Sequence, residues 1–347
     1  ITTEQGEIDL IQFIVNNPEK HLGAKTLKTF STLPYLLKIL DVAKMLSIQV
    51  HPSIQSAIKG YALEQNAGIA INASNRNYKD QNHKPEVMVA LSDFWLLHGF
   101  LPEDKLRIAL QQYPALNSFL SVFEKGGYQL LYQTFMELPQ DQVDAILMPL
   151  VSQAIESVAS GIVTKSKPEW WVNKYYQGKA PKENIDKGIF SIYIMNIMFV
   201  SKYQAVYQGA GILHAYLEGQ NIELMANSDN VLRGGLTTKH VDVPELLQHV
   251  DFVPTIPKPI DPITINEFET QFPCPIQDFG LSKISINEGK TYTINTDSLE
   301  ILLLIEGEVI INPLGPILAG GSVLILPNKE VIINATKPST LFRAYVP

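Results

Sequence analysis

The stretch Ser47-Ile-Gln-Val-His-Pro52 decides how the fold of this chain is read. In an extended strand, successive side chains point to opposite faces, so Ser47, Gln49 and His51 share one face and the two apolar side chains between them share the other. Three polar side chains on one face do not suit a packed apolar core. They suit a small polar cavity inside a β-barrel, and we predict that this strand lines such a cavity.

Two later segments supply further possible metal ligands. Glu86 ends the run His83-Lys-Pro-Glu86, just before a strand-like apolar stretch, and His214 lies within a second β-type run. With Gln49 and His51 they give two imidazoles and two oxygen donors. A set rich in imidazole and oxygen but without thiolate favours an open catalytic zinc site over a closed structural one.

Each of these residues also has a structural interpretation. Gln49 and His51 could be a polar core pair bonded to the backbone, and Lys84 and Glu86 could be a surface ion pair, which contributes little stability. His214 could be a half-buried histidine bonded to a carbonyl. We assign that structural role to four other histidines, namely His21, His98, His240 and His249.

Composition limits the classes of partner. The chain has 347 residues, 46% hydrophobic and 18% charged, which indicates a globular protein of two or three domains. A net charge of −8 argues against nucleic acid or an anionic membrane as the main partner. Cys274 is the only cysteine, so no intrachain disulfide can form and we expect a cytoplasmic setting. Because the chain begins at Ile1 with no signal peptide, we expect a truncated or processed N-terminus.

The hydrophobic pattern divides the chain into segments. We expect a helix at 8–20, strands at 33–39 and 46–51, a long polar loop at 56–85 and a helical insertion from 93 to about 160. Pro102 followed by two acids should open one helix of that insertion. We expect a connecting loop at 165–186 and a strand at 188–196. After a proline-rich crossover, we expect short strands at 282–286, 290–294, 299–306, 309–311, 322–326, 331–334 and 340–345.

That last region is typical of a sandwich or closed barrel. All seven histidines lie at or before His249, so this region offers no imidazole ligand and we expect a structural role for it.

Two further segments carry candidate catalytic charges. Arg233 and Lys239 lie six residues apart in a stretch rich in turn formers, on or next to a loop. They could form a solvated basic edge, or they could clamp a phosphate or a developing oxyanion opposite a metal. Glu223 lies in a strand-like run with apolar neighbours on the opposite face. A lone inward carboxylate near a metal could act as a general base.

Four motifs in the same order resemble those of the type I phosphomannose isomerase family, and the resemblance extends from Ile8 to Pro347. The motifs are Gln49-Val-His51-Pro, Asn75-Arg-Asn-Tyr-Lys-Asp-Gln-Asn-His-Lys-Pro-Glu86, His214-Ala-Tyr-Leu-Glu-Gly and Met225-Ala-Asn-Ser-Asp-Asn-Val-Leu-Arg233-Gly-Gly-Leu-Thr-Thr-Lys239.

The resemblance implies a mainly β fold of two cupin-type (jelly-roll) barrels plus a helical domain. Residues 1–92 would form the first part of the metal-binding barrel, 93–185 the helical insertion, 186–250 the rest of that barrel and 251–347 a second barrel without metal ligands. The chain departs from the family pattern in three places. An N-terminal strand region with a Trp-Gly motif has no counterpart, Lys202-Tyr-Gln204 replaces Pro-Gly-Glu, and Thr238 replaces Pro.

The resemblance also implies a zinc-dependent interconversion of mannose 6-phosphate and fructose 6-phosphate. Gln49, His51, Glu86 and His214 would bind Zn²⁺, Arg233 and Lys84 would lie at the reacting carbons, and Ser47 and Lys239 would hold the phosphate. Either Glu223 or Lys84 could be the base. The expected partner is a small sugar phosphate bound by a monomer, without nucleic acid or membrane. The alternatives are a sugar-phosphate-binding protein without turnover and a metal-dependent cupin dioxygenase.

Overall fold

A computed structural model describes residues 1–3 and 6–347, and the chain divides into two compact units. Unit 1 comprises Ile1–Lys38, Leu224–Asn227 and Ile260–Pro347, and unit 2 comprises Ile39–Glu223 and Ser228–Pro259. Within the described residues, no helix is both long enough and apolar enough to cross a membrane.

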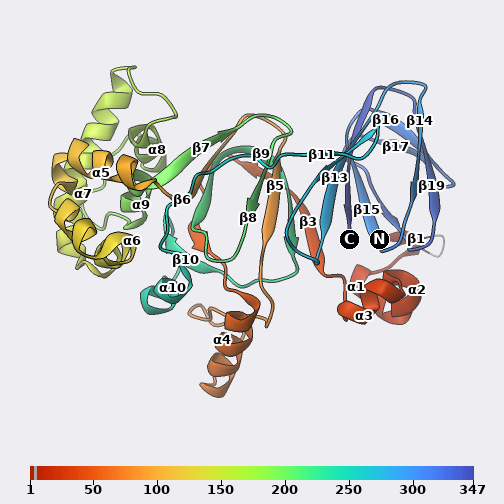
Figure 1. Cartoon of the computed structure of the whole chain (residues 1–347), viewed down its shortest axis with the longest axis horizontal. Coiled ribbons are helices and arrows are strands. Elements are labelled where there is room, and N and C mark those ends of the chain that lie inside the picture. The colour runs from red at the N-terminus through yellow and green to blue at the C-terminus, as the bar shows by residue number, and fades with distance from the viewer. Residues whose placement is uncertain (4–5) are drawn as a thin grey trace. The chain divides into compact units, whose positions relative to one another are not determined.

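The site lies in a curled, half-barrel antiparallel sheet of eight strands, whose curvature is visible in Figure 1. The hydrogen-bonded order is β10-β4-β9-β5-β8, while β6 pairs with β7 and β9 and β3 pairs with β9. The strands are β3 (Tyr35–Val42), β4 (Ile48–Val50), β5 (Glu86–Ala90), β6 (Phe94–Phe100), β7 (Met195–Val200), β8 (Ala205–Gln208), β9 (His214–Ala226) and β10 (Leu232–Gly235).

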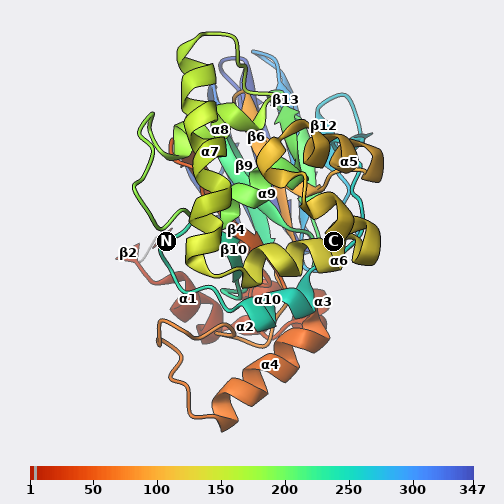
Figure 2. The ribbon, with the colours of Figure 1, turned by 90° about the vertical axis from the view of Figure 1, so that its left-hand side faces the viewer.

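Helices cover one face of this sheet. Figure 2 shows α6, α7 and α9 in front of β4, β9 and β10. Ile48, Leu97, Ala215 and Leu232 belong to the same buried cluster as the apolar side chains of these helices. The helices of unit 2 are α4 (Ile54–Asn66), α5 (Glu103–Gln112), the 3₁₀ turn η1 (Pro114–Leu116), α6 (Phe119–Glu137), α7 (Gln140–Ala159), α8 (Pro168–Tyr175), α9 (Gly188–Ile194) and α10 (Val243–His249).

Side chains on the alternate positions of the same strands form a second buried cluster, which includes Met88, Leu96, Val206 and Tyr216. One face of the sheet therefore packs against helices. The opposite, concave face is apolar over part of its area and carries the polar residues described below.

Unit 1 joins three short helices to antiparallel sheets. Its larger sheets run in the orders β11-β12-β13-β20-β15-β18 and β14-β19-β16-β17 around a buried apolar core that includes Ile284, Leu302 and Ile333. The elements are β1 (Thr2–Thr3), β2 (Gly6–Glu7), α1 (Leu10–Asn16), α2 (Pro18–Leu22), α3 (Ala24–Thr29), β11 (Ile263–Thr264), β12 (Glu269–Phe272), β13 (Gly280–Ile286), β14 (Thr291–Asn295), β15 (Glu300–Glu306), β16 (Glu308–Asn312), β17 (Gly315–Leu318), β18 (Ser322–Ile325), β19 (Glu330–Ala335) and β20 (Ser339–Tyr345).

Most predicted elements are confirmed. Each of the seven short strands predicted after residue 280 has an observed counterpart, and the helix at 8–20 is broken at Asn17 as its Asn-Pro pair indicates. Helix α5 begins at Glu103 with Pro102 at its N-cap. The structure is thus a mixed α/β fold with a curled antiparallel sheet and further antiparallel sheets.

Four predicted segments were wrong in part. Residues 54–66 of the expected polar loop form α4, because Ser53 caps the helix by accepting the N–H of Ser56. Residues 94–100 form strand β6 and not a helix, and 168–175 form helix α8. Residues 188–194 form a helix, α9, before β7. Every residue of α9 is buried, so no polar–apolar period distinguishes it from a buried strand.

Candidate metal centre

Four polar side chains form a row across neighbouring strands of the curled sheet. Arg233 on β10 lies opposite Gln49 on β4, and Gln49 lies opposite His214 on β9. His214 in turn lies opposite His98 on β6. Directly opposite residues of antiparallel strands project from the same face. Because Ile48 and Ala215 pack against the helices, this row lies on the concave face.

His51 and Glu86 complete a buried cluster with His214. His51 directly follows β4, and Glu86 is the first residue of β5. The Nε2 atom of His51 lies 3.2 Å from Oε1 of Glu86, and Nε2 of His214 lies 3.4 Å from Oε2. All three side chains are at most 2% exposed. One ligand atom from each residue lies within 4.8 Å of the others.

The backbone fixes which nitrogen of each imidazole faces the carboxylate. Nδ1 of His51 is 3.0 Å from the carbonyl oxygen of Asn230, and Nδ1 of His214 is 2.9 Å from that of Ile212. A carbonyl only accepts, so each Nδ1 carries a proton and donates it. Each neutral ring then turns the lone pair of its Nε2 towards Glu86. These Nε2 atoms and Oε2 of Glu86 are buried without a hydrogen-bond partner.

The electrostatics support this protonation state. Burial lowers the pKa of His51 to about 4, although Glu86 opposes the shift. Burial alone would raise the pKa of Glu86, but nearby positive charge, including the Lys84 ammonium, lowers it well below its ordinary value. We therefore take His51 as neutral and Glu86 as ionised near pH 7.

Three lone-pair donors that face one another favour a cation between them. Two ligand atoms about 2.0–2.1 Å from a tetrahedral zinc ion lie roughly 3.3 Å apart, which agrees with the 3.2 and 3.4 Å separations. Gln49, opposite His214, adds an amide oxygen to the same face. The donor atoms therefore fit a divalent metal of the zinc type.

A second group of hydrogen bonds fixes the carbonyl that holds His51. The Asn230 side chain is fully buried and donates from Nδ2 to the carbonyl oxygens of Asp80 and Asn82. Its Oδ1 accepts the N–H of Lys79 at 2.7 Å. Asn230 thus joins the segment before Glu86 to the segment before Arg233. Its sequence context indicated only a turn, so sequence reasoning missed this supporting role.

Two more charged groups lie on the same side of the sheet. Nζ of Lys84 is 3.2 Å from Oε1 of Glu86, and the Lys84 side chain is mostly buried. Burial raises the pKa of Tyr216, as do the charges of Glu223 and Glu86 and a hydrogen bond with Glu223. Tyr216 lies on the concave face, so this contact puts the Glu223 carboxylate there too.

A bulge explains how His214 and Glu223 share a face although they are nine residues apart in sequence. In a regular strand an odd spacing would put them on opposite faces. The pairing of β9 with β6 shifts by one residue between Tyr216 and Glu218, which reverses the alternation.

The two residues predicted to hold phosphate are more exposed. Ser47 is partly exposed and lies two residues before Gln49, while Lys239 is exposed beyond the end of β10. The N–H of Lys239 donates to Oγ1 of Thr237 at 3.1 Å. Arg233 lies within strand β10 and is partly buried. Burial lowers its pKa, so its charge is incompletely solvated.

The four histidines for which we predicted a structural role divide into two groups. Nδ1 of His21 lies 2.6 Å from the carbonyl oxygen of Phe13, and Nε2 of His98 lies 3.3 Å from that of Tyr207. His249 contacts the side chains of Tyr78 and Glu245, and His240 is exposed. For these two residues, the prediction of a half-buried histidine that is hydrogen-bonded to a carbonyl was wrong.

Two buried polar residues on the concave face were missed from the sequence. His98 belongs to the polar row, and Gln208 lies opposite Glu86. Only the strand register reveals these positions.

Comparison with known proteins identifies the relatives of this chain. A model of the phosphomannose isomerase type I catalytic domain matches residues 2–103. Mannose-6-phosphate isomerase of Salmonella typhimurium is 33% identical over 357 residues, covering 99% of this chain and 87% of that protein.

Solved structures give the same result. A crystal structure of a mutant phosphomannose isomerase from Salmonella typhimurium has a TM-score of 0.86 and 31% identity, covering 99% of this chain and 87% of that one. A structure of mannose 6-phosphate isomerase bound with zinc and yttrium has a TM-score of 0.79 and 30% identity, covering 98% of this chain and 86% of that one.

Replacing His51 tests the metal cluster. We expect His51→Ala to weaken zinc binding by more than about 100-fold, because losing even an outer partner of a ligand costs 10–100-fold. Zinc content after dialysis, measured by mass spectrometry, is the readout. His21→Ala is the matched control, since it removes a buried imidazole whose Nδ1 bonds a carbonyl outside the cluster. Equal zinc content in the two variants would exclude His51 as a ligand.

Proposed function

The chain belongs to the type I phosphomannose isomerase family, and we propose that it uses one zinc ion to interconvert mannose 6-phosphate and fructose 6-phosphate through a cis-enediol. It is an aldose–ketose isomerase. The observation that carries this proposal is the buried set of His51, Glu86 and His214, whose lone pairs converge without hydrogen-bond partners. Gln49 would be the fourth ligand. When bound, zinc would polarise the sugar oxygens and stabilise negative charge on them.

Arg233 and Lys84 would stabilise charge at the reacting carbons. The register of β10, β4 and β9 supports this role for Arg233, because it puts the residue in one row with Gln49 and His214. A partly desolvated guanidinium interacts more strongly with a developing oxyanion than a solvated one does. Lys84 is paired with Glu86 at 3.2 Å, so its ammonium would both hold this ligand and face the sugar oxygens.

Glu223 is the better candidate for the base. The ammonium of Lys84 is already paired at 3.2 Å with Glu86, one of the proposed zinc ligands. Glu223 is 5% exposed and contacts Tyr216 on the concave face. In the proposed reaction its carboxylate takes the proton from C2 of mannose 6-phosphate and returns it to C1.

Ser47 and Lys239 would hold the phosphate at the edge of the site. Both are accessible, as a group that receives a charged, hydrated phosphate must be. An anchor remote from the reacting carbons converts binding energy into orientation of the sugar.

We also propose that the antiparallel sheets belong to two cupin-type barrels. The curled sheet would be a cupin-type, metal-binding barrel, and the C-terminal strands of unit 1 would form a second cupin-type barrel without metal ligands. The four boundaries expected from the sequence (1–92, 93–185, 186–250 and 251–347) remain a prediction, as do the monomeric state and the cytoplasmic setting.

A coupled assay tests the proposed function. Mannose 6-phosphate is supplied with phosphoglucose isomerase and glucose 6-phosphate dehydrogenase, and NADPH formation is followed. We expect turnover that is lost with a chelator and restored by zinc. Binding of mannose 6-phosphate without turnover would favour the non-catalytic alternative. Oxygen uptake by the iron-loaded protein without isomerisation would favour the dioxygenase.

Arg233→Ala tests charge stabilisation. We expect zinc to stay bound while kcat falls by roughly two to three orders of magnitude, the scale for losing a preorganised charge at an oxyanion. The control is Arg107→Ala, which removes an exposed arginine paired with Glu103 and Glu124. A rise in KM alone would make Arg233 a binding residue and reject its catalytic role.

Lys239→Ala tests the phosphate anchor. We expect apparent affinity for mannose 6-phosphate to fall by about 1.5–3 kcal/mol, the range for a charge-assisted contact, with little change for unphosphorylated mannose. Steady-state kinetics with both sugars gives the comparison, and Lys125→Ala, an exposed lysine on α6, is the control. Similar losses for both sugars would show that Lys239 supports its segment and does not bind phosphate.

A further inference from the structure

We propose that Asp186, in the connection between α8 and α9, is a positioning residue that holds the segment between Arg233 and Lys239 in place for the isomerisation. This inference rests on the proposed roles of those two cations. It gives the connection between α8 and α9 a part in the reaction although no residue of this connection belongs to the metal cluster.

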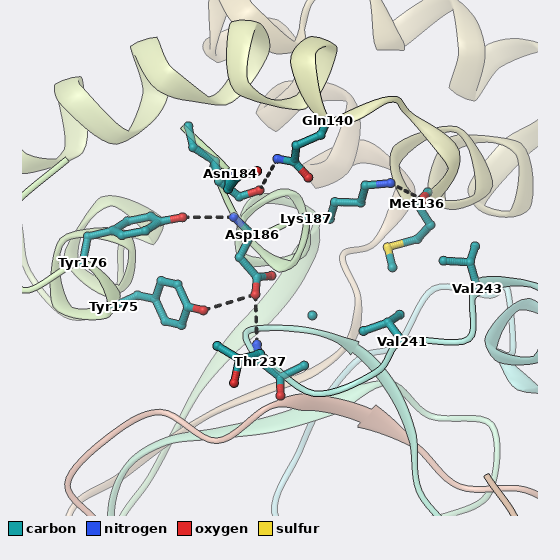
Figure 3. Close-up of a pocket in the computed structure, with 13 residues that line it drawn as sticks. Met136, Gln140, Tyr175, Tyr176, Asn184, Asp186, Lys187, Thr237, Val241 and Val243 are labelled. Atoms are coloured by element: carbon teal, nitrogen blue, oxygen red, sulfur yellow. Dashed lines mark hydrogen bonds between the residues drawn. The ribbon is translucent and has the colours of Figure 1, made fainter. Parts of the chain in front are cut away.

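The carboxylate of Asp186 accepts four hydrogen bonds. Its Oδ1 accepts the N–H of Leu236 at 2.7 Å and the N–H of Gly188 at 2.7 Å. Its Oδ2 accepts the N–H of Thr237 at 2.9 Å and the hydroxyl of Tyr175 at 3.2 Å. Figure 3 shows Asp186 directed at Thr237, with Tyr175 beside it. Each oxygen therefore joins the region from α8 to the start of α9 to the segment after β10.

The held residues lie between the two proposed substrate cations. Leu236 and Thr237 follow Arg233 by three and four residues and precede Lys239. Oγ1 of Thr237 accepts the N–H of Lys239 at 3.1 Å, which extends the connection from Asp186 to that lysine. Leu236 has φ of 53°, a left-handed conformation that is unfavourable for leucine and needs support from its surroundings.

The two backbones also meet without side chains between them. A Cβ atom on Gly235 would lie 2.5 Å from Cα of Gly188, and one on Gly188 would lie 2.5 Å from the nitrogen of Leu236. Only glycine permits so close an approach. The Asp186–Gly188 turn and the Gly235–Thr237 segment therefore form a single packed junction.

Strand β10 depends on this junction because the sheet holds it on one side only. It lies at the end of the strand order, next to β4, and its register shifts between Arg233 and Gly235. Asp186 is itself fixed, since its N–H donates to the Tyr176 hydroxyl at 3.1 Å (Figure 3). Without the carboxylate, the short strand and the chain beyond it would lose their second support.

Asp186→Asn is the decisive variant. A carboxamide has one acceptor oxygen, so its NH₂ group faces the N–H groups of Leu236 and Gly188 in one orientation and that of Thr237 in the other, and at least one hydrogen bond to the segment after β10 is lost. We expect kcat/KM for mannose 6-phosphate to fall by about 100-fold, the scale for a small misplacement of catalytic groups. Zinc content should be unchanged, and amide hydrogen exchange over 234–239 should accelerate.

Asp144→Asn is the matched control. Asp144 on α7 accepts the N–H groups of Asn184 and Ile185, both at 2.8 Å, and so anchors the same connection without touching the segment after β10. We expect a lower unfolding temperature but unchanged kcat/KM and unchanged exchange over 234–239. The same kinetic loss in both variants would show that Asp186 only stabilises the insertion and would overturn the proposal.

A second variant and the activity of the wild-type protein complete the test. If Asp186→Asn does not fold, Thr237→Val replaces it, because this isosteric change removes the acceptor for the Lys239 N–H. A raised KM with kcat retained supports the proposed connection from Asp186 through Thr237 to Lys239, and an unchanged KM rejects that connection. Wild-type protein that binds zinc but does not isomerise mannose 6-phosphate would reject the proposed function instead. Active wild-type protein with unaltered Asp186→Asn kinetics would reject this inference alone.

Discussion

The structure of the site depends on two hydrogen bonds from imidazole to backbone. His51 and His214 each donate Nδ1–H to a carbonyl oxygen, so each neutral ring presents its Nε2 lone pair to the buried carboxylate of Glu86. Burying a charge beside lone pairs is costly unless a cation compensates. The fold thus specifies a metal ion by orienting three acceptors towards one point, and the carbonyl that holds His51 is fixed in turn by Asn230.

The antiparallel sheet makes this arrangement possible through its two unlike faces. Helices of the insertion bury the apolar side chains of β4, β6, β9 and β10, which leaves the concave face free to carry polar groups. Strand register then aligns Arg233, Gln49 and His214 in one row. The connection between α8 and α9 also reaches the segment after β10 through Asp186. The helix packing, the strand register and the Asp186 carboxylate together position the charged side chains around the proposed substrate.

Much of this could be predicted from the sequence, because strand alternation is a local property. Alternation placed Gln49 and His51 together, and the short strands of unit 1 were found from their turns. Non-local features could not be found in this way. The position of His98 beside His214 follows from register, and the shared face of His214 and Glu223 requires a bulge. The role of Asp186 depends on a contact between segments about 50 residues apart in sequence.

Anomalous diffraction at the zinc edge, from crystals of the zinc-loaded chain, tests the central claim most directly. The account predicts one strong peak about 2.0–2.2 Å from Nε2 of His51, Nε2 of His214 and a carboxylate oxygen of Glu86, with the Gln49 amide oxygen as a further ligand. A crystal with full zinc occupancy at other residues, or with Nε2 of either histidine bonded to Glu86 through a proton and no metal between them, would contradict it.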